Sequence, residues 1–418
     1  MRTIKRPRFV PAPREIATML LVGSGLAGLG VASGCAEAVI AVNDESTGGA
    51  GGAGGAAESS SSEVASSSSG SLMVTPQACD PGTFALGFDA EGRIECGPID
   101  GAVVGAVHSS CSLYYGWRDS CDNCMEGPAK WGRVGGELCE NGSGADGSCL
   151  SLTVASEPLP LYGVSTEGDV DGNDKFYVGL HCPALGDSAA PGPCEPGEVA
   201  VSWDPSGYFT CYPIARLVGR YVAESCSAYL GWRDSCNGCT EPPTKWGHTE
   251  MLSCANGAGD DGTCTTPLLG GRWVTTFGIN TDGNVNNDDK FYAGIHCKQR
   301  DDATVDALGA CPPGTALVGI EADASLVCAS LAPAVSSIVR KRCFVYAGWR
   351  DSCNGCNDAP SKWGRASSEA CELFEGADSS CITATLDGVA VPLVALNTDG
   401  DVNGDDKFYA GFRCVATP

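Results

Sequence analysis

Short apolar runs alternate with polar, glycine-rich turns along most of the chain after residue 78. Segments 159–166, 272–281 and 391–398 alternate apolar and polar side chains with the period of a β-strand. Each segment leads into a polar loop and then into K-F-Y-x-G, which predicts a second strand after the loop. Paired apolar runs on either side of a turn, as in 311–328, predict a β-hairpin. The pattern therefore predicts a mostly β fold.

One helical pattern interrupts these strands. A short linker after each hairpin places apolar residues at helical intervals, with Val103, Val104 and Val107 in its first copy and Leu217, Val218 and Tyr221 in its second. We expect one short helix there.

Cysteines divide the chain into three repeats. Of 25 cysteines, 24 form three sets of eight with identical spacings of 17, 15, 10, 3, 15, 10 and 33 residues. Only the joints between sets vary in length, so we place the boundaries there. We predict a small disulfide-rich, mostly β fold with three tandem homologous modules, each a β-hairpin plus a cystine-rich β domain, at residues 78–183, 193–298 and 310–415.

The recurring Cys-x-x-Cys pair has three possible roles. It could contribute to a zinc site, act as a redox motif, or form a structural disulfide. An even number of cysteines in each repeat of an exported chain favours structural disulfides. Eight cysteines allow 105 pairings, so the sequence leaves the connectivity open.

The N-terminus has the order of an export signal: a basic leader, an apolar run from about Ile16 to Val31, and A-S-G-C ending at Cys35. This ending resembles a bacterial lipobox, which implies that Cys35 carries a lipid that anchors the chain to a membrane. An ordinary cleaved signal or an uncleaved membrane helix is the alternative. We expect a lipoprotein signal peptide at 1–34, a disordered Gly/Ala/Ser-rich linker at 35–77, and export to the bacterial cell envelope as an outer-membrane lipoprotein facing the exterior or the periplasm.

Charge narrows the range of partners. The chain has 51 acidic and 26 basic residues, a net charge of −25, and removal of the signal peptide leaves a net charge near −29. Such a surface repels nucleic acid and anionic lipid. We therefore expect no nucleic-acid partner and a preference for cations.

Three aspartate-rich loops recur before the last strand of each repeat, as in T-D-G-D-V-N-G-D-D-K at 398–407. Short oxygen-bearing side chains at this spacing suit a hard cation, so calcium is the expected cofactor. The candidate ligands are Asp169, Asp171, Asn173, Asp174, Asn284, Asn286, Asp288, Asp289, Asp401, Asn403, Asp405 and Asp406. The loops resemble the first half of dockerin-type calcium loops, and D-K-F-x-x-G-x-x-C is similar to the calcium loop of fibrinogen-related domains. The alternative is a tight turn in which these side chains cap their own backbone.

Aromatic and charged residues recur in C-x-x-Y-x-G-W-R-D-S-C-x-x-C and in P-x-K-W-G. One interpretation is an aromatic platform for a sugar ring or peptide, and the other is a packed tryptophan pair with an Arg–Asp salt bridge. The candidate ligand-binding residues are Trp117, Arg118, Asp119, Trp131, Trp232, Arg233, Asp234, Trp246, Trp349, Arg350, Asp351 and Trp363.

Catalysis has little support in the sequence. The four histidines do not form a repeated set, and no nucleophile elbow, phosphate-binding loop or H-E-x-x-H motif occurs, so we expect no enzyme activity. The expected function is a lipid-anchored surface protein with calcium-stabilised recognition or adhesion modules for a polysaccharide or surface glycan. A structural spacer or coat component without a ligand is the alternative, and a polysaccharide hydrolase is a third.

Overall fold

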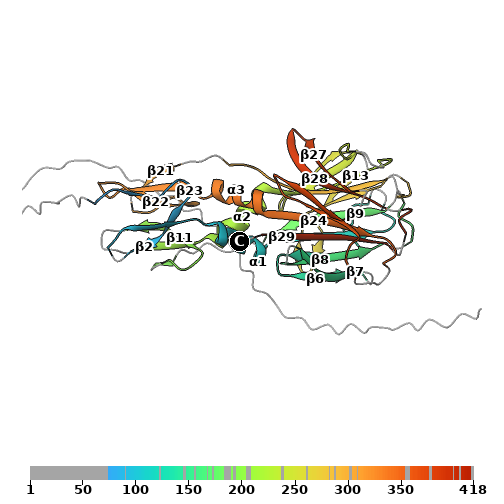
Figure 1. The fold of residues 1–418 in the computed structure, drawn as a ribbon, viewed down its shortest axis with the longest axis horizontal. Coiled ribbons are helices and arrows are strands. Elements are labelled where there is room, and N and C mark those ends of the chain that lie inside the picture. The colour runs from blue at the N-terminus through green and yellow to red at the C-terminus, as the bar shows by residue number, and fades with distance from the viewer. Residues whose placement is uncertain are drawn as a thin grey trace, which may run out of the picture. The chain divides into compact units, whose positions relative to one another are not determined.

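A computed structural model describes residues 74–415 except for short segments at 90, 122–123, 145–146, 155–156, 167, 172–173, 183–189, 192–193, 204–208, 237–239, 260–261, 282, 287–288, 301–303, 308, 354–357, 376–378, 399 and 404–405. The expected signal peptide, Cys35 and the linker up to residue 73 lie outside the described residues. The described part is mostly β, as the alternating pattern predicts, with three short helices (Figure 1).

Each repeat begins with a β-hairpin, which confirms the prediction from the paired apolar runs. The hairpins are β2 (Phe84–Phe88) with β3 (Ile94–Gly97), β11 (Glu198–Trp203) with β12 (Phe209–Pro213), and β22 (Thr315–Ile320) with β23 (Leu326–Ser330). Short strands extend two of them: β10 (Ala190–Pro191) pairs with β12, β1 (Gln77–Ala78) with β22, and β21 (Thr304–Ala307) with β23. The first strands of the three hairpins contact one another.

A helix follows each hairpin, as the helical spacing predicts. The helices are α1 (Asp100–Ser110), α2 (Ile214–Ser225) and α3 (Ala332–Arg342). Valines a turn apart face the core in each helix, for example Val335 and Val339 in α3. Every helix ends at the third cysteine of its repeat, where the chain becomes extended. None of the described helices is long and apolar enough to cross a membrane.

Three six-stranded antiparallel sheets contain most of the remaining strands. In hydrogen-bonded order, the first is β16 (Gly262–Thr265), β19 (Thr276–Asn280), β9 (Lys175–His181), β4 (Ser112–Arg118), β5 (Lys130–Gly135) and β6 (Cys139–Ser143). The second is β15 (Cys254–Ala258), β14 (Lys245–Thr249), β13 (Cys226–Arg233), β20 (Lys290–Cys297), β28 (Val389–Asn397) and β27 (Ser379–Leu386). The third is β26 (Cys371–Glu375), β25 (Lys362–Ala366), β24 (Cys343–Arg350), β29 (Lys407–Cys414), β8 (Glu157–Ser165) and β7 (Gly147–Val154). A small hairpin of β17 (Leu268–Leu269) and β18 (Arg272–Trp273) interrupts the second repeat.

Each sheet takes four strands from one repeat and two from another. The second repeat completes the sheet of the first, the third completes that of the second, and the first completes that of the third. Strand β8 therefore pairs with β29, at the other end of the chain, and not with β9, which follows it in sequence. The exchange closes into a ring, so the sheets cross the boundaries of the sequence repeats.

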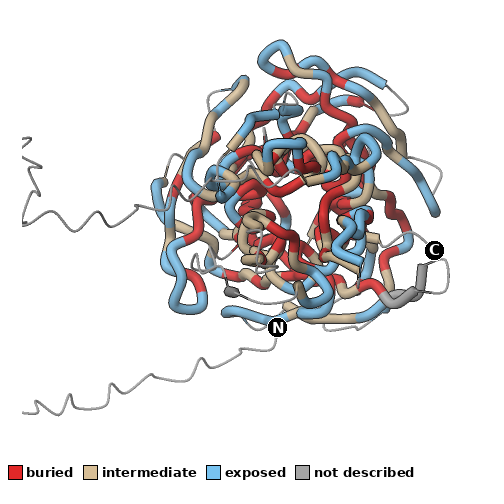
Figure 2. Tube along the Cα trace, turned by 90° about the vertical axis from the view of Figure 1, so that its left-hand side faces the viewer, coloured by how far each residue is buried: buried red, intermediate tan, exposed pale blue. Residues whose placement is uncertain are grey.

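The centre of the ring is packed with three equivalent phenylalanines. The ring centroids of Phe176, Phe291 and Phe408 lie 4.9 Å apart in all three pairs, at edge-to-face angles. One hydrophobic cluster connects these rings with the helices and with all three sheets. Figure 2 shows the buried segments around the centre and the exposed segments outside them. The three repeats thus share a single core.

Disulfides connect cysteines within each repeat, as the even cysteine count predicts. Bridges at separations of 17, 71 and 10 residues recur in all three repeats, and Cys121 pairs with Cys124 in the first. The shortest of the recurring loops closes across β6 and β7 and its equivalents, while the longest joins the two central strands of each sheet. Each bridge adds roughly 2–4 kcal/mol by restricting the unfolded chain.

Candidate functional site at the aspartate-rich loops

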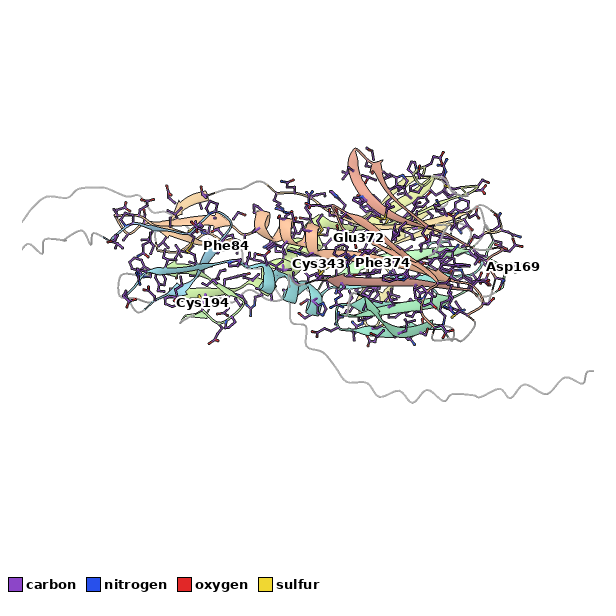
Figure 3. All side chains as sticks on the ribbon, in the orientation of Figure 1. Phe84, Asp169, Cys194, Cys343, Glu372 and Phe374 are labelled. Carbon is purple, nitrogen blue, oxygen red and sulfur yellow. A yellow bond between two sulfur atoms is a disulfide. The ribbon has the colours of Figure 1, made fainter. Side chains whose placement is uncertain are left out.

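The three aspartate-rich loops, residues 166–174, 281–289 and 398–406, meet at one end of the sheets. The N–H of Val170 donates to the carbonyl of Val402 (2.9 Å), Val402 to Val285 (2.8 Å), and Val285 back to Val170 (2.9 Å). This closed ring of backbone hydrogen bonds surrounds the same axis as the phenylalanine triad. Asp169 lies at the end of the sheets remote from Phe84 and Cys194 (Figure 3).

A threonine at the start of each loop fixes it to a neighbour. Oγ1 of Thr166 donates to the carbonyl of Asn403, at 2.9 Å. The equivalent hydroxyls of Thr281 and Thr398 donate to the carbonyls of Asp171 and Asn286, at 3.0 and 2.7 Å. Because each loop holds the next, the three loops form one interlocked structure.

The predicted cation ligands occupy different environments along each loop. The first position is exposed (Asp169, Asn284, Asp401), the third is half-buried (Asp171, Asn286, Asn403), and the last is buried (Asp174, Asp289, Asp406). The fifth position, at Asn173, Asp288 and Asp405, lies outside the described residues. Among the described residues, no three His, Cys, Asp or Glu side chains lie close enough together to bind a metal ion.

The buried aspartates of the second and third loops each accept hydrogen bonds from two segments far apart in sequence. Oδ1 of Asp406 accepts the N–H of Ser352 (3.1 Å), and its Oδ2 accepts the N–H of Asn403 (3.2 Å). Asp289 repeats both contacts with Ser235 (3.3 Å) and Asn286 (3.2 Å). These bonds attach the loop to the W-R-D-S turn at the end of the first sheet strand.

The first repeat differs at one atom. Asp174 accepts the N–H of Ser120 at 3.2 Å through Oδ1, while its buried Oδ2 has no hydrogen-bond partner among the described residues. An unpaired buried carboxylate oxygen is costly. It leaves a lone pair free to bind a cation or a proton.

Each W-R-D-S turn also places a second carboxyl beside the buried one. Ser352 bridges the two, since its N–H donates to Asp406 and its Oγ donates to Oδ1 of Asp351 at 2.7 Å. Burial, followed by repulsion from the neighbouring aspartate, raises the pKa of the buried carboxyl to about 7. The same causes raise the pKa of Asp174 and Asp289 to about 7, beside Asp119 and Asp234.

The three carboxyl pairs have oxygen chemistry that fits a hard cation. Calcium in proteins takes carboxylate, carbonyl and amide oxygens. A carboxyl pair without a positive neighbour is stable only if it shares a proton or binds a cation. Nζ of the lysine after each loop donates to a hydroxyl group of another repeat: Lys175 to Thr263 (2.8 Å), Lys290 to Ser380 (3.2 Å) and Lys407 to Ser148 (3.1 Å).

The first tryptophan of each repeat belongs to the core. Trp117, Trp232 and Trp349 are no more than 1 % exposed, so none of these rings can lie against a ligand in this conformation. Nζ of Lys362 lies 5.2 Å from the ring centroid of Trp349 and donates to the carbonyl of Asn397 at 3.1 Å. Their burial favours the packing role over the aromatic platform.

The second tryptophan stacks on a tyrosine of the neighbouring strand. The pairs are Tyr114 with Trp131, Tyr229 with Trp246, and Tyr346 with Trp363, at centroid distances of 5.8–6.3 Å. Trp246 and Trp363 are buried, and Trp131 is half-buried. Only Trp131 among these six presents appreciable surface.

The arginine of W-R-D-S holds the loop that follows it. Arg118, Arg233 and Arg350 each donate to a loop carbonyl nine residues later, at Gly127, Pro242 and Ala359. The adjacent Asp119, Asp234 and Asp351 are exposed and do not form the Arg–Asp salt bridge considered from the sequence. Sequence reasoning grouped these aspartates with the tryptophans, whereas the fold groups them with the aspartate-rich loops.

Two sets of buried lysines recur; the sequence suggested the first only as a polar contact of the aromatic platform and gave the second no role. One is the lysine of P-x-K-W-G, which lies over the buried tryptophan, and the other follows each aspartate-rich loop. Their recurrence in all three repeats was the available signal. Comparison with known proteins adds no assignment, because no family model, curated protein or solved structure matches this chain.

Proposed function

We propose that this protein is an exported, lipid-anchored surface protein whose three homologous modules form a calcium-stabilised recognition site for a polysaccharide or surface glycan. The observation that carries the proposal is the threefold recurrence of a carboxyl pair at the interlocked loops. The cysteine-rich composition and the lipobox-like ending at Cys35 support export and anchoring.

Calcium would be held by the buried aspartate of each loop and the aspartate of the W-R-D-S turn, with amide or carbonyl oxygens of the same loop. Bound there, the ion supplies positive charge that offsets the repulsion within the pair. Residues of the chain position the ligands: the threonine contacts and the ring of valine hydrogen bonds fix the loop backbones, and the serine N–H groups orient the buried carboxyls.

Clustering of the loops determines how a target would be engaged. Sites on three separate modules would be spaced apart along the chain. Here the three loops surround one axis and are hydrogen-bonded to one another, so the three sites are neighbours in space. A repetitive glycan could then contact two or three loops of the same molecule. Such multivalent contact raises avidity without any stronger single contact.

The experiment is a glycan-binding screen with calcium and with EDTA, using the wild type and a variant that carries Asp119→Asn, Asp234→Asn and Asp351→Asn. These positions are exposed, so the variant should fold. We expect calcium-dependent binding by the wild type and none by the variant. Binding that is equal in EDTA, or retained by the variant, would contradict the proposal.

A structural spacer remains a second candidate function, and the buried tryptophans favour it. A rigid body with shielded aromatic residues, shared core and disulfides in every repeat needs no ligand. A screen without any bound glycan, together with calcium-dependent thermal stability, would support the spacer.

A further inference from the structure

The threefold repetition fails at the helices. Gly82, Gly197 and Gly314 occupy equivalent positions in the three hairpins, each facing the helix of another repeat. A methyl group on Gly197 would lie 4.0 Å from Cβ of Ala102 in α1, whereas nothing lies within 4 Å of one on Gly82 or Gly314. Helix α1 also packs more closely on α2 than α3 packs on either. Two grooves flank α3, and at the third equivalent position Gly197 lies closer to the neighbouring helix α1.

The larger groove lies between α3 and the first hairpin and has a volume of about 770 Å³. The smaller one, between α2, α3 and the third hairpin, has a volume of about 570 Å³. Both volumes are in the range of small-molecule sites in proteins, roughly 300–1,000 Å³. Neither groove contains residues of the aspartate-rich loops.

One wall of the larger groove carries three cations and one carboxylate, Glu369, in a chain of net charge −25. Five cations fall in the two short segments K-Q-R (298–300) and R-K-R (340–342), and Arg300, Arg340 and Lys341 line the groove. Lys341 is exposed and forms no ion pair with any other described residue. Three of the five cations lie at the end of α3, and the other two follow strand β20.

Two of these cations are held in place by neighbours. The guanidinium of Arg300 lies 5.6 Å from the ring centroid of Tyr221, and its Nη2 donates to Oγ of Ser225 at 3.1 Å. Nε of Arg340 lies 3.3 Å from Oε1 of Glu369, and its Nη1 donates to Oε1 of Gln299 at 3.4 Å. Ordering these side chains in advance reduces the entropy cost of binding an anion.

The side of the groove opposite α3 carries two aspartates, and the α3 side also carries hydroxyl groups. Asp80 and Asp100 line the side formed by the first hairpin and α1, while Ser330 and Ser337 lie along α3 and its approach. A ligand that fits must carry carboxylates for the basic wall and hydroxyl donors for the acidic wall. The side chains of an acidic peptide supply carboxylates and no hydrogen-bond donors for Asp80 and Asp100, whereas each sugar of a uronic acid oligosaccharide carries both a carboxylate and hydroxyl groups.

We propose that the larger groove binds an acidic oligosaccharide of the uronic acid class, and that it does so without calcium. Carboxylates of the sugar face Arg300 and Lys341, and its hydroxyl groups donate to Asp80 and Asp100. This site is separate from the aspartate-rich loops, so it stands or falls independently of the calcium-dependent function.

The test is isothermal titration of the purified protein with a galacturonic acid hexamer in EDTA. Lys341→Glu reverses one exposed charge of the wall, and we expect it to weaken binding by about tenfold, in line with loss of one charged contact. Ser337→Trp fills the larger groove and should abolish binding. Two matched controls, Arg272→Glu on exposed strand β18 and Pro313→Trp in the smaller groove, should leave the affinity within about twofold.

Several outcomes would overturn the proposal. They are absence of hexamer binding in EDTA, equal binding by Lys341→Glu and the wild type, and equal binding of a neutral galactose hexamer or of poly-glutamate. Binding that the Asp119→Asn, Asp234→Asn and Asp351→Asn variant loses would assign the ligand to the aspartate-rich loops instead. Unchanged binding by that variant supports a second, calcium-independent site even if the glycan screen at the loops fails.

Discussion

Without calcium, the wild type should lose stability between pH 5 and pH 8, and replacing Asp406 by asparagine should remove the part of this loss that comes from Asp406. Asparagine keeps the size of the side chain and has no proton to lose. The folded pKa of Asp406 is raised above its ordinary value of 3.8, to about 7. Stability that depends on the protonated form is therefore complete below about pH 4 and is lost as the pH rises to 7. The variant is exempt from this loss.

The magnitude follows from the size of the shift. At 1.36 kcal/mol for each tenfold change in the proton equilibrium, a rise from 3.8 to about 7 corresponds to about 4 kcal/mol. Only the part between pH 5 and pH 7, about 2.7 kcal/mol, falls within the range from pH 5 to pH 8. Water entry and relaxation around the site reduce such penalties, so we expect roughly half of that part, about 1.4 kcal/mol. Loss of the Asn403 N–H contact costs the variant about 1 kcal/mol at every pH and leaves the slope unchanged.

The assay is urea unfolding of both proteins in EDTA at several values from about pH 5 to pH 8, analysed as the difference between them. Differences are needed because burial lowers the pKa of His181, His248 and His296, which adds a slope of opposite sign below their ordinary pKa in both proteins. Asp401→Asn, at the exposed position of the same loop, is the control and should show no pH-dependent difference. Calcium at about 10 mM should restore wild-type stability at pH 8 and leave Asp406→Asn unchanged at this site. A flat difference across the range would mean that Asp406 is already ionised at pH 5, and the reasoning would fail.

Three further predictions concern the core, the bridges and the tryptophans. Phe408→Ala should lower the free energy of unfolding by about 3–5 kcal/mol in urea titrations, because the ring is buried against Phe176 and Phe291. Phe374→Ala, at a position that is 38 % exposed, should cost about 1 kcal/mol or less. Equal losses in the two variants would contradict a shared core. Replacing Cys343 and Cys414 by alanine, which opens a 71-residue loop, should cost about 4 kcal/mol, against about 3 kcal/mol for the 10-residue loop of Cys371 and Cys381; the reverse order in denaturant midpoints would refute the entropic account. Iodide should quench the fluorescence of Trp273, which is 68 % exposed. Trp273→Phe should therefore remove most of the quenching, whereas Trp349→Phe, at a buried position, should not. Strong quenching that survives in Trp273→Phe would place another tryptophan at the surface.

Local features of the fold follow from the sequence because they depend on neighbours along the chain. The alternation at 391–398 identifies a strand, and the strand observed is β28, Val389–Asn397. The short helix after each hairpin ends at the third cysteine of its repeat, and a disulfide joins the two ends of each hairpin. Period and spacing are sufficient for such elements.

The exchange of strands does not follow from the sequence. A period of two tells which face of a strand is buried, and it does not tell which strand lies beside it. Strand β8 could pair with β9 across its own loop, yet it pairs with β29, 242 residues away at Lys407 and Ser165. The physical reason is that each loop crosses at the axis, where Val170, Val285 and Val402 hydrogen-bond to one another across the repeats. Such contacts become visible only when all three copies are present together.

The sequence predicts only one half of each carboxyl pair, because the two aspartates come from separate motifs that folding brings together. Asp406 belongs to the loop that the spacing identifies, but Asp351 lies in another motif, 55 positions earlier, and the sequence connects it only with Trp349 and Arg350. Folding separates that motif: the tryptophan enters the core, the arginine holds a loop carbonyl, and the aspartate faces the buried carboxyl. Adjacent residues on a strand and its turn point in different directions, so a conserved spacing among repeats does not mean a common role.

The closed ring explains why the aspartate-rich loops and the grooves beside α3 can differ so much in symmetry. At the loops, each backbone contacts both of its counterparts through the same hydrogen bonds, so a change of backbone conformation in one repeat disturbs all three. At the helices, contact depends on side-chain size, and each helix is free to vary without breaking the ring. Three fused copies therefore keep the symmetry where the backbones interlock, and they acquire a separate groove where only side chains meet.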